Sequence, residues 1–476
     1  LDRRKGGVMF CKDGLAIRDE HGRQRIFKGV NICIKKDKFN YFVYKLEKRF
    51  DKTFAEYVEN GINIIRLGFN WSAIEPEKNC FDERAFEFLK KFVSTAQENN
   101  IYVLLDVHQD LYCSKFSFGD GAPSWVTKDY PRKRPVTIWA EGYFYFKDVQ
   151  RAFNDFWRNK NNVQTDFSEF WDKLVLEFKD FDNVIGYDFL NEPMITDYSN
   201  KIFCQLVGNG LKEGTGEEFC ADDYFKNGRE RRGFIRMFFA FMHRVKKHGG
   251  LKKFLNKLDS YEAFGNAIKG LEKYTEGFNR EYYQPFVDSM ADKIDDDKLA
   301  FFEHNYYSNL GIPFEIQTKD NYIYSPHAYD LFIDSPLYND YSSNARIKYI
   351  IDSIRKNQLK MNVPVVMGEW GGSAQNGHKW VEHIDYIYSQ FEKYQWSSIY
   401  WNYRIHDKKF ISVINRPYPC AVCGDIVEYS TDSNSRSFRL EYNCKENTAP
   451  TVIFVPNRGY VEFENKVGNN VINLNY

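Results

Sequence analysis

Two glutamates stand at the ends of apolar runs that are typical of buried strands. Glu192 follows the run 184–191, and Glu369 closes the run 363–369. An ionised carboxylate is costly to bury unless a partner or a function compensates for its lost hydration. Two facing carboxyl groups, one protonated and one ionised, can cleave a glycosidic bond. The pair therefore predicts acid–base chemistry on a glycoside.

Eight such apolar runs alternate with amphipathic segments along the first 400 or so residues. We expect strands over 27–33, 63–68, 102–107, 184–191, 299–303, 322–327, 363–369 and 398–402, and helices between them, for example over 51–60, 83–99, 167–179 and 344–360. Apolar strands separated by helices favour a parallel sheet covered on its outside. Eight units predict an α/β fold of the (β/α)8 TIM-barrel type, which places catalytic groups at the carboxyl ends of its strands.

The pattern changes after about residue 405, where apolar and polar residues alternate with a period of two. Segments such as 437–442 and 451–455 are separated by Asn, Ser and Gly turns, which predicts a small C-terminal antiparallel β-sandwich. We therefore expect a TIM-barrel catalytic domain over 1–408 with an insertion over 194–298, and a β-sandwich domain over 409–476. The hairpin-like segment 11–22 is expected to cap the bottom of the barrel.

Composition excludes several classes of function. Lys and Arg number 66, as do Asp and Glu, so the net charge is zero and no nucleic-acid partner is expected. No apolar run approaches the roughly 18–20 residues that span a bilayer, so no transmembrane segment is expected. Cys420 and Cys423 are spaced as zinc ligands, but no second pair accompanies them, and we expect neither a metal nor a cofactor. The 42 Phe, 33 Tyr and 9 Trp suit sugar binding, although a codon bias explains them equally well.

Polar residues at further strand ends reproduce a family pattern in order. The pattern has Arg on strand two, His on three, Asn-Glu on four, His-x-Tyr on six, Glu on seven and Trp on eight. The chain supplies Arg66, His108, Asn191-Glu192, His327-Ala328-Tyr329, Glu369 and Trp401. On these residues it resembles the family 5 glycoside hydrolases, which are retaining β-glycosidases on TIM barrels. The segments 106–110, 121–125, 416–424 and 450–456 resemble the endoglycoceramidase branch of that family.

The resemblance implies roles for the residues around the two glutamates. Glu369 would be the nucleophile, and Glu192 would be the acid/base. Arg66 and Tyr329 would hold Glu369 ionised, and His327 would orient Glu192 or the leaving group. No metal or cofactor takes part in this chemistry.

The resemblance also implies contacts with the sugar. Both Lys35 and Lys36 follow the first strand, and we take Lys36 as the candidate. The candidates for substrate binding, in addition to those above, are Lys36, His108, Asp110, Asn191 and Trp401.

The function implied is hydrolysis of the bond between the oligosaccharide and the ceramide of glycosphingolipids. Alternatives within the branch are β-glycosidases of glucosylceramide, galactosylceramide or steryl glucosides; a cellulase-type enzyme or a catalytically silent glycolipid-binding protein also stays open. We expect a monomer acting at a membrane or micelle surface, in a secreted or lysosomal (lumenal) location. The aromatic-rich helix around 234–242 is a candidate lid or membrane contact, or else packs on the barrel.

Overall fold

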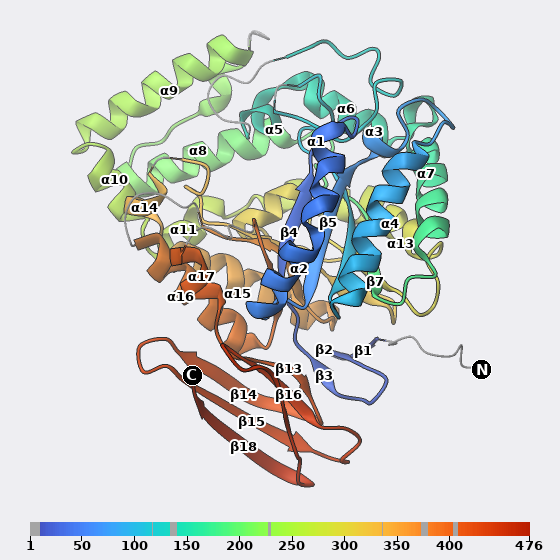
Figure 1. Ribbon diagram of the computed structural model, residues 1–476. Coiled ribbons are helices and arrows are strands. Elements are labelled where there is room, and N and C mark those ends of the chain that lie inside the picture. The colour runs from blue at the N-terminus through green and yellow to red at the C-terminus, as the bar shows by residue number, and fades with distance from the viewer. Residues whose placement is uncertain are drawn as a thin grey trace.

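The computed structural model describes residues 10–116, 118–133, 140–226, 230–335, 337–372, 379–402 and 408–476. At its centre is a parallel sheet built from the predicted apolar runs (Figure 1). The strands are β4 (Lys28–Ile34), β5 (Ile64–Asn70), β6 (Tyr102–His108), β7 (Val184–Asp188), β8 (Leu299–Phe302), β9 (Tyr322–Tyr324), β10 (His327–Ala328), β11 (Val366–Trp370) and β12 (Ser397–Tyr400).

The sheet closes on itself. Its order is β10-β11-β12-β4-β5-β6-β7-β8-β9, so its two ends are successive pieces of the stretch 322–328. Pro326, which has no N–H to donate to a neighbouring strand, separates the two pieces. Tyr324 N–H donates to the carbonyl of Pro364 at 3.0 Å, and Gly368 N–H donates to the carbonyl of Pro326 at 3.0 Å. These bonds join β9 and β10 to the segment of β11, which confirms the TIM barrel.

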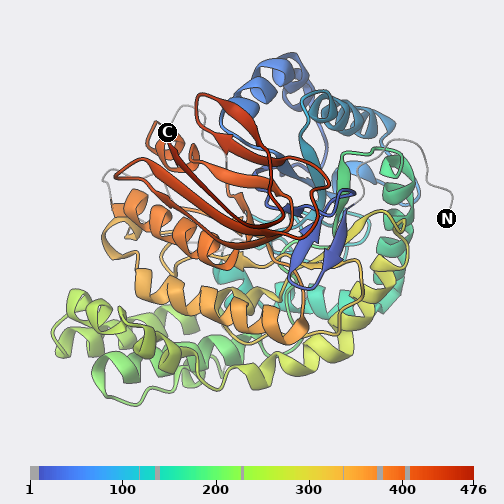
Figure 2. The same cartoon turned by 90° about the horizontal axis from the view of Figure 1, so that it is seen from below.

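Helices surround the barrel, as the view from below shows (Figure 2). The major ones are α2 (Phe50–Glu59), α4 (Glu83–Glu98), α7 (Val163–Phe178), α13 (Gln284–Ala291), α15 (Asn344–Met361) and α16 (Lys379–Tyr394). In α4, the Asp82 carboxylate caps the first turn by accepting from Ala85 N–H at 3.1 Å. Phe86, Leu89 and Val93 are buried at the spacing of one helix face.

The amino-terminal hairpin closes the bottom of the barrel. It comprises β1 (Cys11–Asp13), β2 (Ala16–Arg18) and β3 (Gln24–Arg25). Phe10 and Ile17 belong to one buried cluster with residues of the barrel strands, such as Ile64 and Leu104, which confirms the predicted cap. The sequence did not indicate that β3 would also pair with a C-terminal strand.

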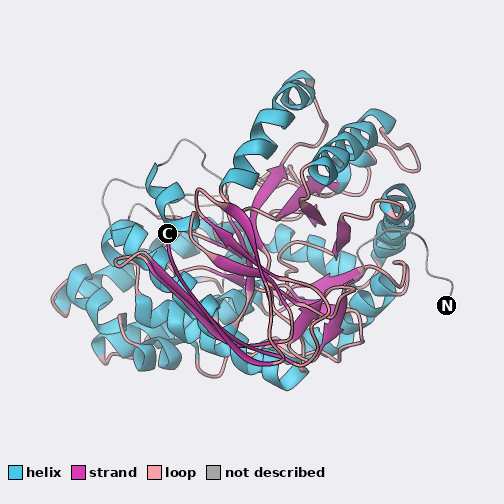
Figure 3. Cartoon of the chain, turned by 60° about the horizontal axis from the view of Figure 1, so that its bottom comes forward, coloured by secondary structure: helices cyan, strands magenta, loops and turns pink. Residues whose placement is uncertain are grey.

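The C-terminal part consists of two antiparallel sheets, which confirms the β-sandwich (Figure 3). Its strands are β13 (Tyr418–Val422), β14 (Asp425–Asp432), β15 (Ser437–Cys444), β16 (Thr451–Val455), β17 (Gly459–Phe463) and β18 (Gly468–Asn475). One sheet has the order β1-β2-β3-β13-β16-β17 and the other β14-β15-β18. Residues 1–9 and 403–407 of the predicted first domain lie outside the described residues, and the boundary at 408/409 remains a prediction.

The insertion between β7 and β8 is helical. It contains α8 (Ser199–Thr215), α9 (Glu230–Lys247), α10 (Leu251–Leu258) and α11 (Tyr261–Ile268). These helices form a small core of their own that includes Leu211, Met237, Val245 and Phe254. Among the described residues, no helix is long and apolar enough to cross a membrane.

Candidate active site

Glu369 lies at the carboxyl end of β11, where both of its oxygens accept a hydrogen bond. Arg66 Nη1 donates to Oε1 at 2.7 Å, and the Tyr329 hydroxyl donates to Oε2 at 2.9 Å. Arg66 is fully buried on β5, so its charge acts on Glu369 with little screening by water. This arrangement orients the carboxylate and stabilises its negative charge, as a nucleophile requires.

Glu192 follows β7 on strained backbone. Its φ is +43°, in the left-handed region that residues with a Cβ rarely adopt. Glu303, just beyond the end of β8, accepts from Glu192 N–H through Oε2 at 2.7 Å. A buried carboxylate just after the neighbouring strand thus holds the turn that aims Glu192 into the barrel mouth.

The carboxyl group of Glu192 has two donors on one oxygen. Oε1 accepts from Asn309 Nδ2 at 2.7 Å and contacts His327 Nδ1 at 3.1 Å. Burial, together with the negative charges of Glu369 and Glu303, raises the pKa of Glu192 against the opposite effect of His327. A raised pKa suits a group that must carry a proton before it acts. Because Oε1 is occupied by donors, the acid proton belongs on Oε2.

The two carboxyl groups lie close together around His327. One oxygen of Glu192, one of Glu369 and one ring nitrogen of His327 all lie within 4.8 Å of one another. Retaining glycosidases hold their carboxyl groups about 5–5.5 Å apart, whereas inverting enzymes need room for a water at about 6.5–9.5 Å. The geometry therefore favours a retaining mechanism.

Buried charges surround this pair. Arg66 contacts Asp106 Oδ1 at 3.0 Å, Asp188 Oδ2 at 2.9 Å and Glu303 Oε1 at 2.8 Å. These three carboxylates are close enough to share a cation, and the Arg66 guanidinium occupies that role here. Although burial opposes it, the charges of Glu303 and Glu369 raise the pKa of His327 well above its ordinary value. A protonated His327 is a donor to Glu192 rather than a metal ligand.

Asn191 joins this network. Its Oδ1 accepts from Arg66 Nη2 at 3.0 Å, and its Nδ2 donates to the carbonyl of Gln109 at 3.1 Å. The predicted contact between Asn191 and a sugar hydroxyl remains a prediction.

A second group of predicted residues lies beside the carboxylates. His108 Nδ1 contacts Asp106 Oδ2 at 2.8 Å, and Asp106 links it to Arg66. The rings of His108 and Trp401 lie parallel, 9° apart, with centroids at 5.6 Å. Asp110 Oδ2 is 3.8 Å from His108 Nε2. This polar and aromatic corner suits a sugar ring and its hydroxyls.

Lys35, not Lys36, completes this corner. Lys35 Nζ bonds to Asp110 Oδ2 and lies 4.6 Å from the ring centroid of Trp401. Lys36 is exposed, because the chain turns directly after β4, where Lys36 N–H donates to the carbonyl of Ile34 at 2.8 Å. The structure therefore corrects the choice between the two adjacent lysines.

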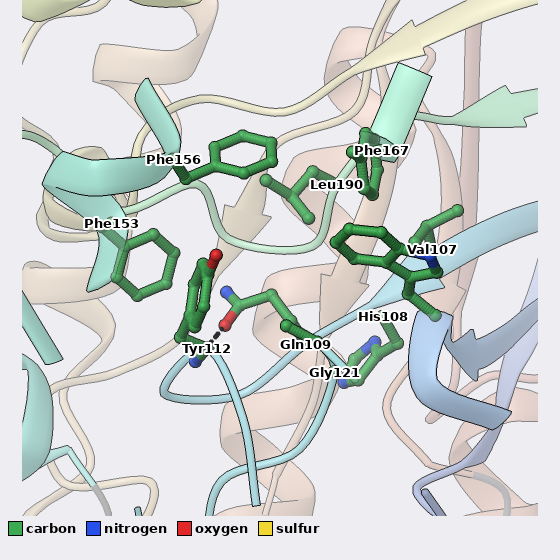
Figure 4. A pocket seen from close by; sticks show the side chains of 11 residues that line it. Val107, His108, Gln109, Tyr112, Gly121, Phe153, Phe156, Phe167 and Leu190 are labelled. Carbon is green, nitrogen blue, oxygen red and sulfur yellow. Dashed lines mark hydrogen bonds between the residues drawn. The ribbon is translucent and has the colours of Figure 1, made fainter. Parts of the chain in front are cut away.

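Apolar space near His108 is limited. A cavity of about 20 Å³ lies behind Gln109 among Phe153, Phe156, Phe167 and Leu190, as Figure 4 shows. This volume holds roughly one water molecule and no lipid chain.

Nine of the ten predicted site residues come together, and the structure adds others. Asn309 lies in the 3₁₀ segment Tyr306–Leu310, and Glu303 precedes it. Glu303 had a usable signal, since it follows an apolar strand as Glu192 does. Asn309 had none, because it sits in an irregular segment with no sequence period.

Comparison of the sequence with models of known protein families shows the family of this chain. The model of the cellulase family (glycosyl hydrolase family 5) matches residues 19–209 and 279–407, which is more than half of the chain. The chain belongs to glycosyl hydrolase family 5. A second model, the glycoside hydrolase family 5 C-terminal domain, matches residues 416–472. Much of the helical insertion lies between the two matched parts of the barrel.

Some curated relatives share part of the sequence, and solved structures share the fold. An endoglycoceramidase of Cyanea nozakii is 29% identical over 203 residues, which cover 38% of this chain and 40% of that protein. The chain thus spans about two fifths of that relative's length. A glucosylceramidase of Rhizopus delemar is 23% identical over 363 residues, which cover 62% of this chain and 52% of that protein. The structure of endo-glycoceramidase II from Rhodococcus sp. in complex with ganglioside GM3 has a TM-score of 0.67 at 19% identity. The match covers 96% of this chain and 98% of that chain, which shows a common fold.

Proposed function

We propose that this family 5 chain is a retaining endo-β-glycosidase that hydrolyses the bond between the oligosaccharide and the ceramide of glycosphingolipids. The observation that carries the proposal is the close pair Glu192 and Glu369, each in surroundings that suit one role. The endoglycoceramidases among its relatives support the choice of substrate.

The first half of the reaction forms a covalent intermediate. A carboxylate oxygen of Glu369 attacks the anomeric carbon while the bond from that carbon to the ceramide oxygen breaks. Glu192 gives its proton to the departing oxygen, and His327 and Asn309 stabilise the carboxylate left behind. Ceramide leaves with the proton, and the glycan stays on Glu369.

The second half releases the glycan. Glu192, now a carboxylate, takes a proton from a water whose oxygen attacks the anomeric carbon on the face that ceramide left. The bond to Glu369 breaks, and its carboxylate returns to the donors Arg66 and Tyr329. Two displacements at one carbon retain the β configuration.

The glucose that adjoins ceramide would be held by Lys35, Asp110, His108 and Trp401. Lys35 and Asp110 offer a donor and an acceptor to its hydroxyls, and Trp401 offers an aromatic face to its C–H surface. We further propose that the protein acts as a monomer at a membrane or micelle surface, in a secreted or lysosomal compartment, because glycosphingolipid head groups face outward or into the lumen.

A second candidate, hydrolysis of glucosylceramide or a related monoglycosyl lipid, is favoured by the Rhizopus delemar relative. Incubation with ganglioside GM1 and, separately, with glucosylceramide, followed by mass spectrometry of the products, distinguishes the two. Intact oligosaccharide and ceramide from GM1 support the first proposal. Glucose and ceramide from glucosylceramide, with GM1 untouched, support the second.

If the chain is a catalytically silent binding protein, neither substrate yields products. The variants Glu192→Gln and Glu369→Gln are the controls that test whether any products come from this site. Loss of products in both variants assigns the reaction to this site. Products at the wild-type rate from either variant would refute the assignment.

A further inference from the structure

Helix α9 carries apolar residues on two of its faces. Met237, Phe241 and Val245 are spaced by four residues and pack into the core of the insertion. On the other face, Ile235, Phe238, Phe239 and Met242 stand at positions i, i+3, i+4 and i+7, which form one stripe on a helix. We call these four residues the outer stripe.

The outer stripe faces solvent. Ile235 is 38% exposed, Phe238 46% and Phe239 67%, and Met242 is half-buried. Exposed clusters of large apolar side chains, unlike single ones, mark interaction sites. The buried residues of α9 lie on its inner face, whereas none of the four residues of the outer stripe is fully buried.

Basic residues flank the outer stripe. Arg231, Arg232 and Arg236 are exposed on α9, and the only acidic residue of the helix, Glu230, bonds to Lys133. The whole chain has a net charge of zero, so this positive charge is a local feature. Arginines beside an aromatic stripe complement a surface that is apolar inside and anionic at its edge, which describes a lipid bilayer or mixed micelle.

The position of α9 relates it to the active site. Figure 1 shows α9 at the end of the barrel opposite the C-terminal sheets, the same end as α1 (Tyr41–Tyr44), which follows β4. The carboxyl ends of the barrel strands, and therefore the catalytic pair, open toward this end. Tyr41 and Phe42 on α1 are 69% and 75% exposed, so a second aromatic pair lies at this end.

A row of aromatic rings connects the outer stripe with the site. Phe238 stacks on Phe234 at 6.4 Å, and Phe234 contacts Phe203 at 6.3 Å. Phe203 stacks on Phe144 at 5.1 Å, and Phe144 contacts Tyr306 at 6.2 Å. Tyr306 lies near enough to Glu192 for the two groups to interact electrostatically. Because Phe203 is buried and Phe144 and Phe234 are partly buried, this row is packed interior that links α9 to the segment of Tyr306.

We propose that the outer stripe of α9 docks the protein on an anionic lipid surface, at the end of the molecule where the active site opens. The purpose of docking rests on the proposed function, but binding to lipid needs no hydrolysis. The two ideas can therefore fail separately.

The test is co-sedimentation with phosphatidylcholine vesicles, with and without phosphatidylserine, and free of glycolipid. We expect wild type to bind the anionic vesicles more tightly than the neutral ones, and to lose that difference in about 1 M NaCl, where the Debye length is about 3 Å. Phe238→Ser/Phe239→Ser should weaken binding by roughly tenfold or more, and Arg232→Ala/Arg236→Ala should remove the preference for anionic lipid.

The matched control is Val467→Ser, since Val467 is 73% exposed on the C-terminal part, at the opposite end of the molecule. It should bind as wild type does. All variants should keep the wild-type melting temperature and the wild-type rate on a water-soluble aryl β-glycoside, which reports the catalytic pair alone. Hydrolysis of vesicle-borne glycolipid should fall only in the α9 variants.

The proposal would be overturned if wild type bound neither kind of vesicle, or if the Phe238→Ser/Phe239→Ser variant bound as tightly as wild type. It would also be overturned if light scattering showed wild type to be a dimer that this variant converts to a monomer without loss of lipid binding. Lipid binding without any glycosidase activity would instead uphold docking and reject the proposed function.

Discussion

Replacing Asn309 by alanine should weaken acid catalysis without disturbing the nucleophile. Asn309 Nδ2 donates to Glu192 Oε1 at 2.7 Å, and its Oδ1 contacts His304 Nε2 at 2.6 Å. Burial and the positive charge of His327 lower the pKa of His304 to about 3, so its ring is neutral and carries one N–H. His304 thereby fixes the amide of Asn309 with its N–H groups toward Glu192.

The magnitude follows from this contact. A hydrogen bond to a charged group contributes about 1.5–3 kcal/mol. When Glu192 protonates the leaving oxygen it becomes a carboxylate, and the Asn309→Ala variant lacks this donor for the developing charge. If the full contribution is felt in the transition state, the rate falls by about 10- to 150-fold. Hydrogen bonding to the charged form also lowers a pKa, so the variant has a higher pKa at Glu192 and its basic limb of kcat/KM moves to higher pH.

The assay compares two leaving groups. Dinitrophenolate departs from a dinitrophenyl β-glycoside without protonation, so the kcat/KM of Asn309→Ala on this substrate, which reports the first step alone, should stay close to the wild-type value. A glycolipid or alkyl glycoside needs the proton, so its kcat/KM should show the loss. Asn309→Asp, which keeps the size but places an acceptor against Glu192, should move the basic limb further than alanine does.

Equal losses on both leaving groups would show that Asn309 only supports the fold of the site. No loss on either substrate, with an unmoved pH profile, would refute the role given to this hydrogen bond.

Two further predictions concern lysines. Lys35→Met should lower kcat/KM by about 10- to 100-fold, because it breaks a charge-assisted bond to Asp110. The kcat/KM of Lys36→Met should stay within about twofold of the wild-type value, because Lys36 is exposed. Equal kinetics of the two variants would contradict the choice of Lys35. Burial lowers the pKa of Lys28 to about 7, whereas an unfolded lysine titrates near about 10.4. Between these two pKa values the unfolded state therefore binds more protons than the folded state. Denaturant titrations should show that the free energy of unfolding of wild type, relative to that of Lys28→Met, rises from about pH 7 to about pH 10. If this difference in free energy falls or stays flat over that range, the burial argument is wrong.

The catalytic pair could be predicted because its signal is local. A carboxylate after a run of apolar residues is costly unless it has a role, and both Glu192 and Glu369 lie at strand ends, where a TIM barrel gathers its polar groups. The strands and helices were predicted for the same reason, since burial imposes their periods directly on the sequence.

The rest of the site depends on irregular chain. Beyond the end of β4 nothing in the sequence says which of Lys35 and Lys36 turns inward. Asn309 reaches Glu192 from a 3₁₀ segment, where no repeat links position to direction. The pairing of β3 with β13 joins residues about 400 positions apart, as in Gln24 with Val422, and short strands carry little information about distant partners.

The most direct test of the central claim is to trap the covalent intermediate. Wild type would be incubated with an activated 2-deoxy-2-fluoro β-lactoside, and with the glucoside in parallel, and the labelled peptide would be identified by mass spectrometry. We predict one glycosyl group per chain, attached to Glu369, and a β-configured sugar as the first product released from the unmodified substrate. A label on another residue, or release of the α-anomer with no label, would contradict the assignment of Glu369 and Glu192.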